Sequence, residues 1–149
     1  MKKRVCILMG SPRKNGNTMQ LLQPFMQQLQ QSGCECELIW LYDKNIQPCR
    51  ACRCCQKDHS IFGCAIRDDM PDIFDSVLQC DLLVLATPIY SWYCTPPMKS
   101  VLDRLVYGMN KYYGEQKVRR NARLLRVSRR SSKTWWHRCK SSRRPFCRS

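Results

Sequence analysis

The sequence Val5-Cys-Ile-Leu-Met-Gly-Ser-Pro-Arg-Lys-Asn-Gly-Asn-Thr18 joins a short apolar run to a polar loop that contains two glycines. The apolar run, residues 5–9, has the length of a buried β-strand, and the residues after the loop have the spacing of a helix. A helix start offers unpaired backbone N–H groups and a positive dipole end to an anion. The stretch therefore predicts a strand, a phosphate-binding loop and a helix. A polar turn that only caps the helix, through Asn17 or Thr18, is the alternative.

The spacing of the two glycines separates this loop from two common phosphate loops. Five residues lie between Gly10 and Gly16, and Asn17 stands where an NTPase loop has its lysine. The glycine fingerprint of dinucleotide-binding loops is absent as well. An NTPase and a dinucleotide site are therefore disfavoured, and a single phosphate is the expected ligand.

Strand-like and helix-like segments alternate three times along the first 110 residues. The expected strands cover 5–9, 35–41 and 81–86, and the expected helices cover 18–32, the residues after Asp69, and those from Met98 onward. Pro24 lies inside the first helix, where it predicts a kink or a later helix start. The fold class predicted from this alternation is α/β, with an open, doubly wound parallel sheet that binds its ligand at the carboxyl ends of the strands.

The positive charge of the chain is concentrated at its C-terminal end. The 149 residues carry a formal charge of +15, but residues 1–117 hold 14 Lys and Arg against 11 Asp and Glu, whereas residues 118–149 hold 12 against none. We therefore expect a domain over 1–117 and a basic tail over 118–149 that is either disordered or the product of a shifted reading frame. With only about three strands before the tail, the sheet is expected to be incomplete.

The tail also suggests a function of a different class. Its arginines could follow one face of a helix, with Trp135 and Trp136 available to stack on bases, so nucleic-acid or polyanion binding through residues 118–149 is the alternative function. The arginines concerned are Arg119, Arg120, Arg123, Arg126 and Arg130.

Location and redox state are predicted from two further features. Met1-Lys-Lys-Arg4 precedes an apolar run that is too short for a signal peptide, and no apolar run approaches the roughly 20 residues of a membrane-spanning helix. A cytoplasmic protein without membrane contact is expected. Its twelve cysteines are then predicted to be reduced thiols, metal ligands or redox groups instead of a disulfide framework.

Four cysteines form a candidate metal site. Cys49, Cys52 and Cys55 are spaced C-x-x-C-x-x-C, and Cys64 follows them in the same loop. Closely spaced thiolates of this kind suit an iron-sulfur cluster. Zinc, a redox-active pair formed by Cys49 and Cys52, and a metal-free loop of reduced thiols all remain open.

Three segments together resemble a known family. They are residues 10–18, Pro48-Cys-Arg-Ala-Cys52 running on to Asp68-Asp-Met70, and Ala86-Thr-Pro-Ile-Tyr90 with Pro97-Met-Lys99. The chain resembles the NADPH-dependent FMN reductase group of flavodoxin-like proteins, which includes the iron-sulfur flavoproteins. The resemblance covers roughly residues 3–113 and implies that the first loop binds the FMN phosphate while the loop after the third strand lies along the isoalloxazine ring. The implied FMN-binding residues are Ser11, Arg13, Asn15, Gly16, Asn17, Thr18, Thr87, Pro88, Ile89, Tyr90, Ser91 and Trp92.

The resemblance also implies a reaction. NAD(P)H would reduce FMN, which would pass electrons to a small-molecule or protein acceptor, so that no side chain of the protein needs to act as the catalyst. It further implies an iron-sulfur cluster on Cys49, Cys52, Cys55 and Cys64, and a homodimer. Because the family's sheet continues with further strands, a fold that ended at residue 117 would be expected to be impaired in FMN binding.

Overall fold

The computed structural model describes residues 2–58, 61–109 and 123–127. Its centre is a parallel sheet with the strand order β2-β1-β3-β4. The strands are β1 (Arg4–Met9), β2 (Glu35–Trp40), β3 (Leu82–Ala86) and β4 (Arg123–Val127). The predicted α/β class and open parallel sheet are confirmed.

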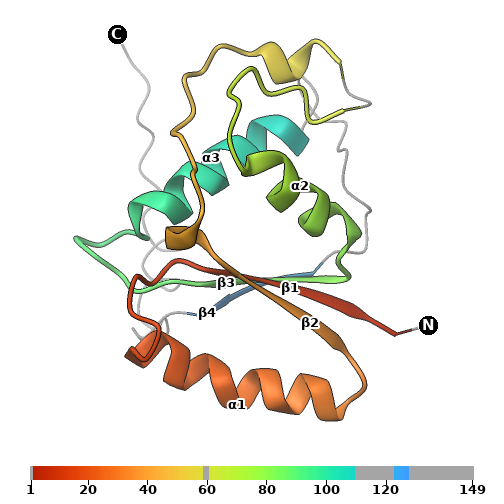
Figure 1. The fold of residues 1–149 in the computed structure, drawn as a ribbon, viewed down its shortest axis with the longest axis vertical. Helices are drawn as coiled ribbons and strands as arrows, with labels where there is room; N and C mark the ends of the chain where they lie inside the picture. Colours follow the sequence, from red (N-terminus) through yellow and green to blue (C-terminus); the bar gives the residue numbers. More distant parts are fainter. Residues whose placement is uncertain (1, 59–60, 110–122, 128–149) are drawn as a thin grey trace, which may run out of the picture.

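Helices cover both faces of the sheet (Figure 1). Helix α1 (Asn17–Gln31) lies on one face, and α2 (Met70–Gln79) and α3 (Pro96–Met109) lie on the other. Two short 3-10 turns, η1 (Leu41–Asp43) and η2 (Cys54–Gln56), interrupt the long connection between β2 and α2. Within the described ranges, no helix is long and apolar enough to cross a membrane.

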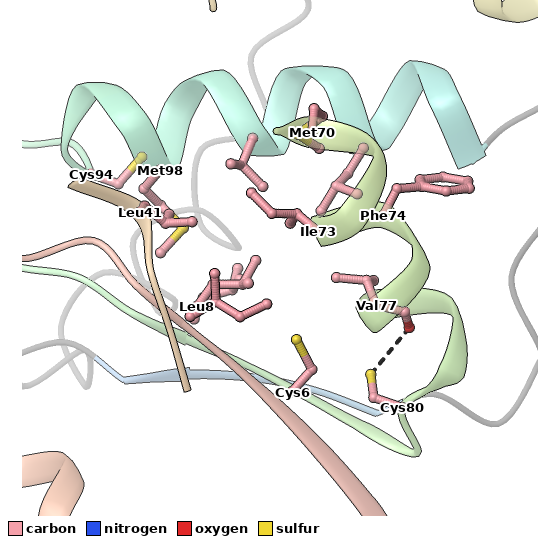
Figure 2. Packing of buried hydrophobic residues seen from close by; sticks show 14 of the residues in the cluster. Cys6, Leu8, Leu41, Met70, Ile73, Phe74, Val77, Cys80, Cys94 and Met98 are labelled. Carbon is pink, nitrogen blue, oxygen red and sulfur yellow. Dashed lines mark hydrogen bonds between the residues drawn. The ribbon is translucent and has the colours of Figure 1, made fainter. Parts of the chain in front are cut away.

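The central strand β1 divides the core into two layers. Cys6 and Leu8 point toward α2 and α3, where they join a buried cluster with Ile73 of α2 and Met98 of α3 (Figure 2). The alternate residues of the strand, Val5, Ile7 and Met9, belong to the cluster beneath α1. All five of these β1 residues are buried, which explains why the strand is a continuous apolar run instead of an alternating one.

The first helix starts earlier than Pro24 suggested. It begins at Asn17 and contains Pro24 in its interior, so a later start is not seen. The loss of one backbone hydrogen bond is offset by burial of the apolar face, since Leu22 is fully buried and packs in a cluster with Phe25, Met26 and Leu29. The helix ends near Gly33, whose φ of +79° is a left-handed conformation that glycine adopts without strain.

The fourth strand corrects the predicted tail. Residues 123–127 form β4 and pair with β3 in parallel, with Leu83 beside Leu124 and Ala86 beside Val127. The sequence analysis missed this strand because it weighed the net positive charge of residues 118–149, and the apolar residues of the strand stand next to arginines. The sheet therefore has one strand beyond the three expected before residue 118, and residues 123–127 of the expected tail belong to that strand. Arg123 and Arg126 belong to a strand, not to the basic helix that the nucleic-acid hypothesis requires, and residues 118–122 and 128–149 lie outside the described residues.

Candidate functional site

The candidate site lies at the carboxyl edge of the sheet, where β1 and β3 end side by side. After β1 the chain passes to α1 on one face, and after β3 it passes to α3 on the other (Figure 1). A reversal of this kind in a doubly wound sheet leaves a crevice between the two connecting loops. The loops are residues 10–16, here called the first loop, and residues 87–95, here called the second loop.

The first loop starts with a glycine that has no room for a side chain. The N–H of Gly10 donates to the carbonyl oxygen of Ala86 at 2.7 Å, which continues the sheet by one residue. A Cβ atom at Gly10 would lie 2.9 Å from Thr95 Oγ1 and 3.0 Å from Thr87 Oγ1. Glycine therefore allows the first loop to pass directly against the second.

The rest of the first loop closes on itself and opens helix α1 without a capping side chain. Ser11 Oγ accepts a hydrogen bond from the Arg13 N–H at 3.2 Å, and the Gly16 N–H donates to the Arg13 carbonyl at 3.2 Å. Gly16 is the N-cap of α1 and forms no side-chain capping hydrogen bond. Capping by Asn17 or Thr18 is therefore not seen, because both residues lie inside the helix. The arrangement fits an anion, such as the phosphate of FMN, at the helix start.

The second loop contains a tight hairpin that carries aromatic side chains. The backbone groups of Tyr90 and Tyr93 exchange two hydrogen bonds of 2.9 Å. The two residues between them have left-handed backbones, with φ of 44° at Ser91 and 71° at Trp92. Such conformations are costly outside glycine and are typical of functional sites. Trp92 is 79% exposed and Tyr90 is 48% exposed, so the hairpin presents flat apolar surfaces.

One buried threonine, Thr95, joins the two loops, and a second, Thr87, holds it within the second loop. Thr95 Oγ1 donates to the carbonyl oxygen of Gly10 at 2.7 Å, and the Thr95 N–H donates to Thr87 Oγ1 at 3.3 Å. The Thr87 hydroxyl in turn donates to the carbonyl of Pro88 at 3.0 Å. Sequence reasoning missed Thr95, because its partner is far away in the chain; the only local signal was a threonine placed directly before the prolines that start α3.

The two loops enclose a cleft of about 1010 Å³. Eleven of the twelve residues predicted to bind FMN line it: Ser11, Arg13, Asn15, Gly16, Asn17, Thr18, Pro88, Ile89, Tyr90, Ser91 and Trp92. The twelfth, Thr87, is only 2% exposed and is not part of the cleft lining. The neighbouring cation Lys14 is directed elsewhere, since its Nζ pairs with Asp43 Oδ2 at 2.9 Å. Arg13 is thus the cationic side chain that the first loop contributes to the cleft lining.

The four predicted cysteine ligands lie around a second, much smaller cavity. Cys49, Cys52, Cys55 and Cys64 all line it, and its volume of about 20 Å³ is close to the room that one water molecule needs. In the described part of the chain, no three His, Cys, Asp or Glu side chains are arranged to hold a metal ion. The four sulfurs have the donor chemistry of a cluster site, but the loop would have to open further to take one up.

The thiols of this loop differ in acidity. Hydrogen bonds from the backbone and side chain of Cys54 lower the pKa of Cys52, and the charge of Arg50 adds a smaller effect. Burial raises the pKa of Cys55. For Cys52, one member of the predicted redox-active pair, the neighbouring Cys54 therefore lowers the pKa more than the charge of Arg50 does.

Comparison with known proteins places these features in a family. A family model described as NADPH-dependent FMN reductase matches residues 3–128, which include β4. The chain is 35% identical over 102 residues to an iron-sulfur flavoprotein of Archaeoglobus fulgidus, a match that covers 68% of this chain and 45% of that protein. It is 32% identical over 101 residues to an iron-sulfur flavoprotein of Methanocaldococcus jannaschii, with 68% and 51% covered. The chain thus spans about half the length of these relatives.

Solved structures with a similar fold include an oxidoreductase and a protein with a bound flavin derivative. An NAD(P)H:quinone oxidoreductase from Methanothermobacter marburgensis matches with a TM-score of 0.66 at 20% identity, covering 86% of this chain and 66% of that one. RosB, solved with the intermediate 8-demethyl-8-formylriboflavin-5'-phosphate, matches with a TM-score of 0.63 at 22% identity, covering 85% and 52%. At this identity the likeness shows a shared flavodoxin-like fold.

Proposed function

Because the chain belongs to the NADPH-dependent FMN reductase family, we propose that its cleft binds FMN and that the protein is an NAD(P)H-dependent oxidoreductase. Bound FMN would supply the hydride and electron chemistry, so the task of the protein is to bind and orient the cofactor. The observation that carries the proposal is the cleft itself, which joins the first loop and the second loop at the carboxyl ends of β1 and β3.

The first loop is proposed to hold the phosphate. Arg13 can donate two parallel hydrogen bonds to phosphate oxygens, and Ser11 and Thr18 contribute hydroxyl groups. The first-turn amides of α1 and the side chains of Asn15 and Asn17 complete the set of donors. A phosphate bound here would lie at the positive end of the α1 dipole.

The second loop is proposed to hold the isoalloxazine ring. Tyr90 and Trp92 offer flat surfaces for stacking, and backbone groups of residues 87–92 offer hydrogen bonds to the polar ring edge. Thr87 is proposed to act indirectly. Its buried hydroxyl donates a hydrogen bond to the carbonyl oxygen of Pro88 and so helps to hold the second loop in its conformation. The tight hairpin fixes the backbone that carries these aromatic side chains before the ring arrives, which lowers the entropic cost of binding.

The cysteine loop is proposed to hold an iron-sulfur cluster through Cys49, Cys52, Cys55 and Cys64. Support comes from the position of the four cysteines around one cavity, which would have to widen, and from the two relatives named iron-sulfur flavoproteins. The electron acceptor is proposed to be a small molecule or a protein, and the protein itself to be a cytoplasmic homodimer. The family resemblance supports these last assignments.

The test is anaerobic purification followed by absorption spectroscopy, acid release of flavin and iron analysis. We expect a flavin spectrum that NADPH bleaches. Flavin-free protein should then be titrated with FMN and with riboflavin, because only FMN carries the phosphate. Tighter binding of FMN is expected, whereas a protein that cannot be reconstituted with FMN, or that binds both flavins equally, would reject the assignment of the first loop.

A further inference from the structure

Two thiols of the cysteine loop contact each other across a sharp bend of the backbone. The side chains of Cys52 and Cys54 are joined by a hydrogen bond. Arg53 stands between them with a left-handed backbone, φ of 58°, and is the N-cap of the 3-10 turn η2. This conformation is costly for a residue that has a side chain. The bend that it produces brings the two sulfur atoms together, although one residue separates the cysteines in the sequence.

The other thiols of this loop have nitrogen donors as partners. Three sulfurs each accept one hydrogen bond: Cys49 from the N–H of Ala51 at 3.4 Å, Cys55 from Gln56 Nε2 at 3.9 Å, and Cys64 from Arg104 NH2 at 3.3 Å. Arg104 is itself fixed, because its buried guanidinium pairs with the buried carboxylate of Asp68. Cys52 and Cys54 differ from these three thiols because their sulfurs are bonded to each other.

Cys52 is the thiol of this pair that a solute reaches first. Among the described cysteines, Cys52 is the exposed one, and Cys54 beside it is half-buried. The turn η2 lies on the side of α3 that faces away from the sheet (Figure 1). Solvent access and a second thiol in contact are the two features that make a cysteine sensitive to reversible oxidation. A small oxidant would therefore meet Cys52, with Cys54 in place to resolve the product.

We propose that Cys52 and Cys54 are a peroxide-sensitive dithiol that closes to a disulfide across Arg53. The inference goes beyond the proposed function and needs neither FMN nor a metal. The sulfur of Cys52 attacks hydrogen peroxide, the O–O bond breaks, and one water leaves while Cys52 becomes a sulfenic acid. The sulfur of Cys54 then attacks that of Cys52, the S–O bond breaks, and a second water leaves. Two electrons and two protons thus pass from the thiols to the peroxide.

The resulting disulfide should be easy to reduce. A bridge across a single residue closes a small, strained ring, and strained or exposed disulfides have the higher reduction potentials. A dithiol such as dithiothreitol should therefore open it again by thiol–disulfide exchange. In the oxidised form Cys52 is no longer available as a thiolate, so the oxidised loop could not use Cys52 as a metal ligand.

The test locates the bridge in the full chain. The protein is treated with a chelator and dithiothreitol, freed of both, and exposed to one equivalent of hydrogen peroxide in the absence of air. The remaining thiols are then alkylated, and tryptic peptides are analysed by mass spectrometry. Trypsin cuts after Arg50, Arg53 and Lys57, so a bridge would hold peptides 51–53 and 54–57 together until it is reduced. We expect this linked product, lighter by two hydrogen atoms than the two free peptides, with the alkyl group of peptide 54–57 on Cys55.

The chain contains a matched control for the spacing. Cys34 and Cys36 are also separated by one residue, but both are half-buried and Cys36 lies in β2. Both should be recovered in the alkylated form. Among variants, Cys54→Ser should lose the bridge, whereas Cys55→Ser, one residue further along, should keep it.

The wild-type measurement decides the proposal even if the serine variants do not fold. A bridge from Cys52 to Cys49 would support the pair predicted from the spacing and overturn this one, as would a bridge from Cys52 to Cys55. Recovery of Cys52 as a free thiol, or its oxidation without any bridge, would overturn the proposal as well. Equal bridging of Cys34 and Cys36 would show that spacing alone directs oxidation, and that the bend at Arg53 has no part in it.

Discussion

The hydroxyl of Thr95 donates a hydrogen bond of 2.7 Å to the carbonyl oxygen of Gly10, across 85 residues of sequence. Thr95 is fully buried, and Gly10 is the residue at which the chain leaves β1 for the first loop. The two loops of the cleft are therefore attached to each other before any ligand arrives. Their separation is set by the fold itself and not by the ligand.

Replacing Thr95 with valine should loosen this attachment. The variant keeps the shape of the side chain but leaves the buried carbonyl of Gly10 without its donor, at a cost of about 1–3 kcal/mol in the free energy of unfolding. FMN affinity should fall as well, because the two loops are no longer held together. Urea unfolding and FMN titration measure the two effects, and Thr95→Ser, which retains the hydroxyl, should behave nearly like the wild type. Equal loss in both variants would contradict the role of the hydrogen bond.

Replacing Gly10 with alanine adds only one methyl group but should reduce both stability and FMN binding. The new methyl group would lie 2.9 Å from Thr95 Oγ1, so either the first loop or the second must move. We expect destabilisation of about 1–3 kcal/mol from overpacking and a marked loss of FMN binding. Gly33→Asn is the matched control, because Gly33 has open space around its Cβ position and asparagine tolerates its left-handed backbone. Normal FMN binding by Gly10→Ala would show that the loops do not need this close approach.

The parts of the fold that could be predicted are those with a local cause. The continuous apolar runs at Val5–Met9 and Leu82–Ala86 mark buried parallel strands whatever surrounds them. The polar loop after β1 likewise carries its own signal, and the structure brings it to the same cleft as residues 88–92.

The parts that were missed depend on partners distant in the chain. Apart from the prolines that follow Thr95, nothing local distinguishes Thr95 or Arg104, since their roles arise from contacts with Gly10 and Asp68. Strand β4 was missed for a different reason. The net positive charge of the surrounding residues was given more weight than the apolar residues of the strand. Its pairing with β3, which lies about 40 residues earlier in the chain, cannot be recognised from the local sequence. The later helix start expected from Pro24 is not seen, because burial of the apolar face of α1 outweighs the loss of one backbone hydrogen bond.

Arg13 and Lys14 should contribute differently to FMN binding although they are neighbours. Arg13 lines the cleft, whereas Lys14 pairs with Asp43. Arg13→Gln should cost about 1.5–3 kcal/mol of FMN binding, the range for a hydrogen bond to a charged group, and should leave riboflavin binding unchanged. Lys14→Gln serves as the control and should change FMN affinity little. Fluorescence titration with both flavins measures this, and an equal effect of the two variants would indicate general electrostatic attraction instead of a specific contact.

The ion pair of Asp68 and Arg104 should make the free energy of unfolding depend on pH in the acidic range. Burial alone would raise the pKa of Asp68, but hydrogen bonds from Arg104 and from the N–H groups of Gln47 and Met70 outweigh it and lower the pKa below its ordinary 3.8. The stabilisation is therefore fully present above pH 3.8 and is lost as the pH falls through the lower, folded-state pKa. Urea unfolding across this range should show a steep loss of stability in the wild type.

Asp68→Asn provides the comparison for this acid dependence. It should be less stable than the wild type by about 3–5 kcal/mol at neutral pH, since Arg104 is left as an uncompensated buried charge. Its stability should also fall less steeply with acid, because the titrating carboxyl has been removed. Parallel pH profiles for the two proteins would show that other carboxyl groups control acid unfolding.

Trp92 offers a case in which stability and binding should change in opposite directions. Its φ of 71° is strained for a tryptophan and natural for a glycine, so Trp92→Gly should relieve backbone strain of about 1 kcal/mol. The same change removes an aromatic surface from the cleft, and the loss of stacking, about 0.5–1.5 kcal/mol, should weaken FMN binding by up to roughly tenfold. Trp92→Asn separates the two effects, because asparagine tolerates the left-handed backbone and carries no ring. If both variants bind FMN as tightly as the wild type, Trp92 does not contact the ring, and the strain at this position must be explained by the hairpin of Tyr90 and Tyr93 alone.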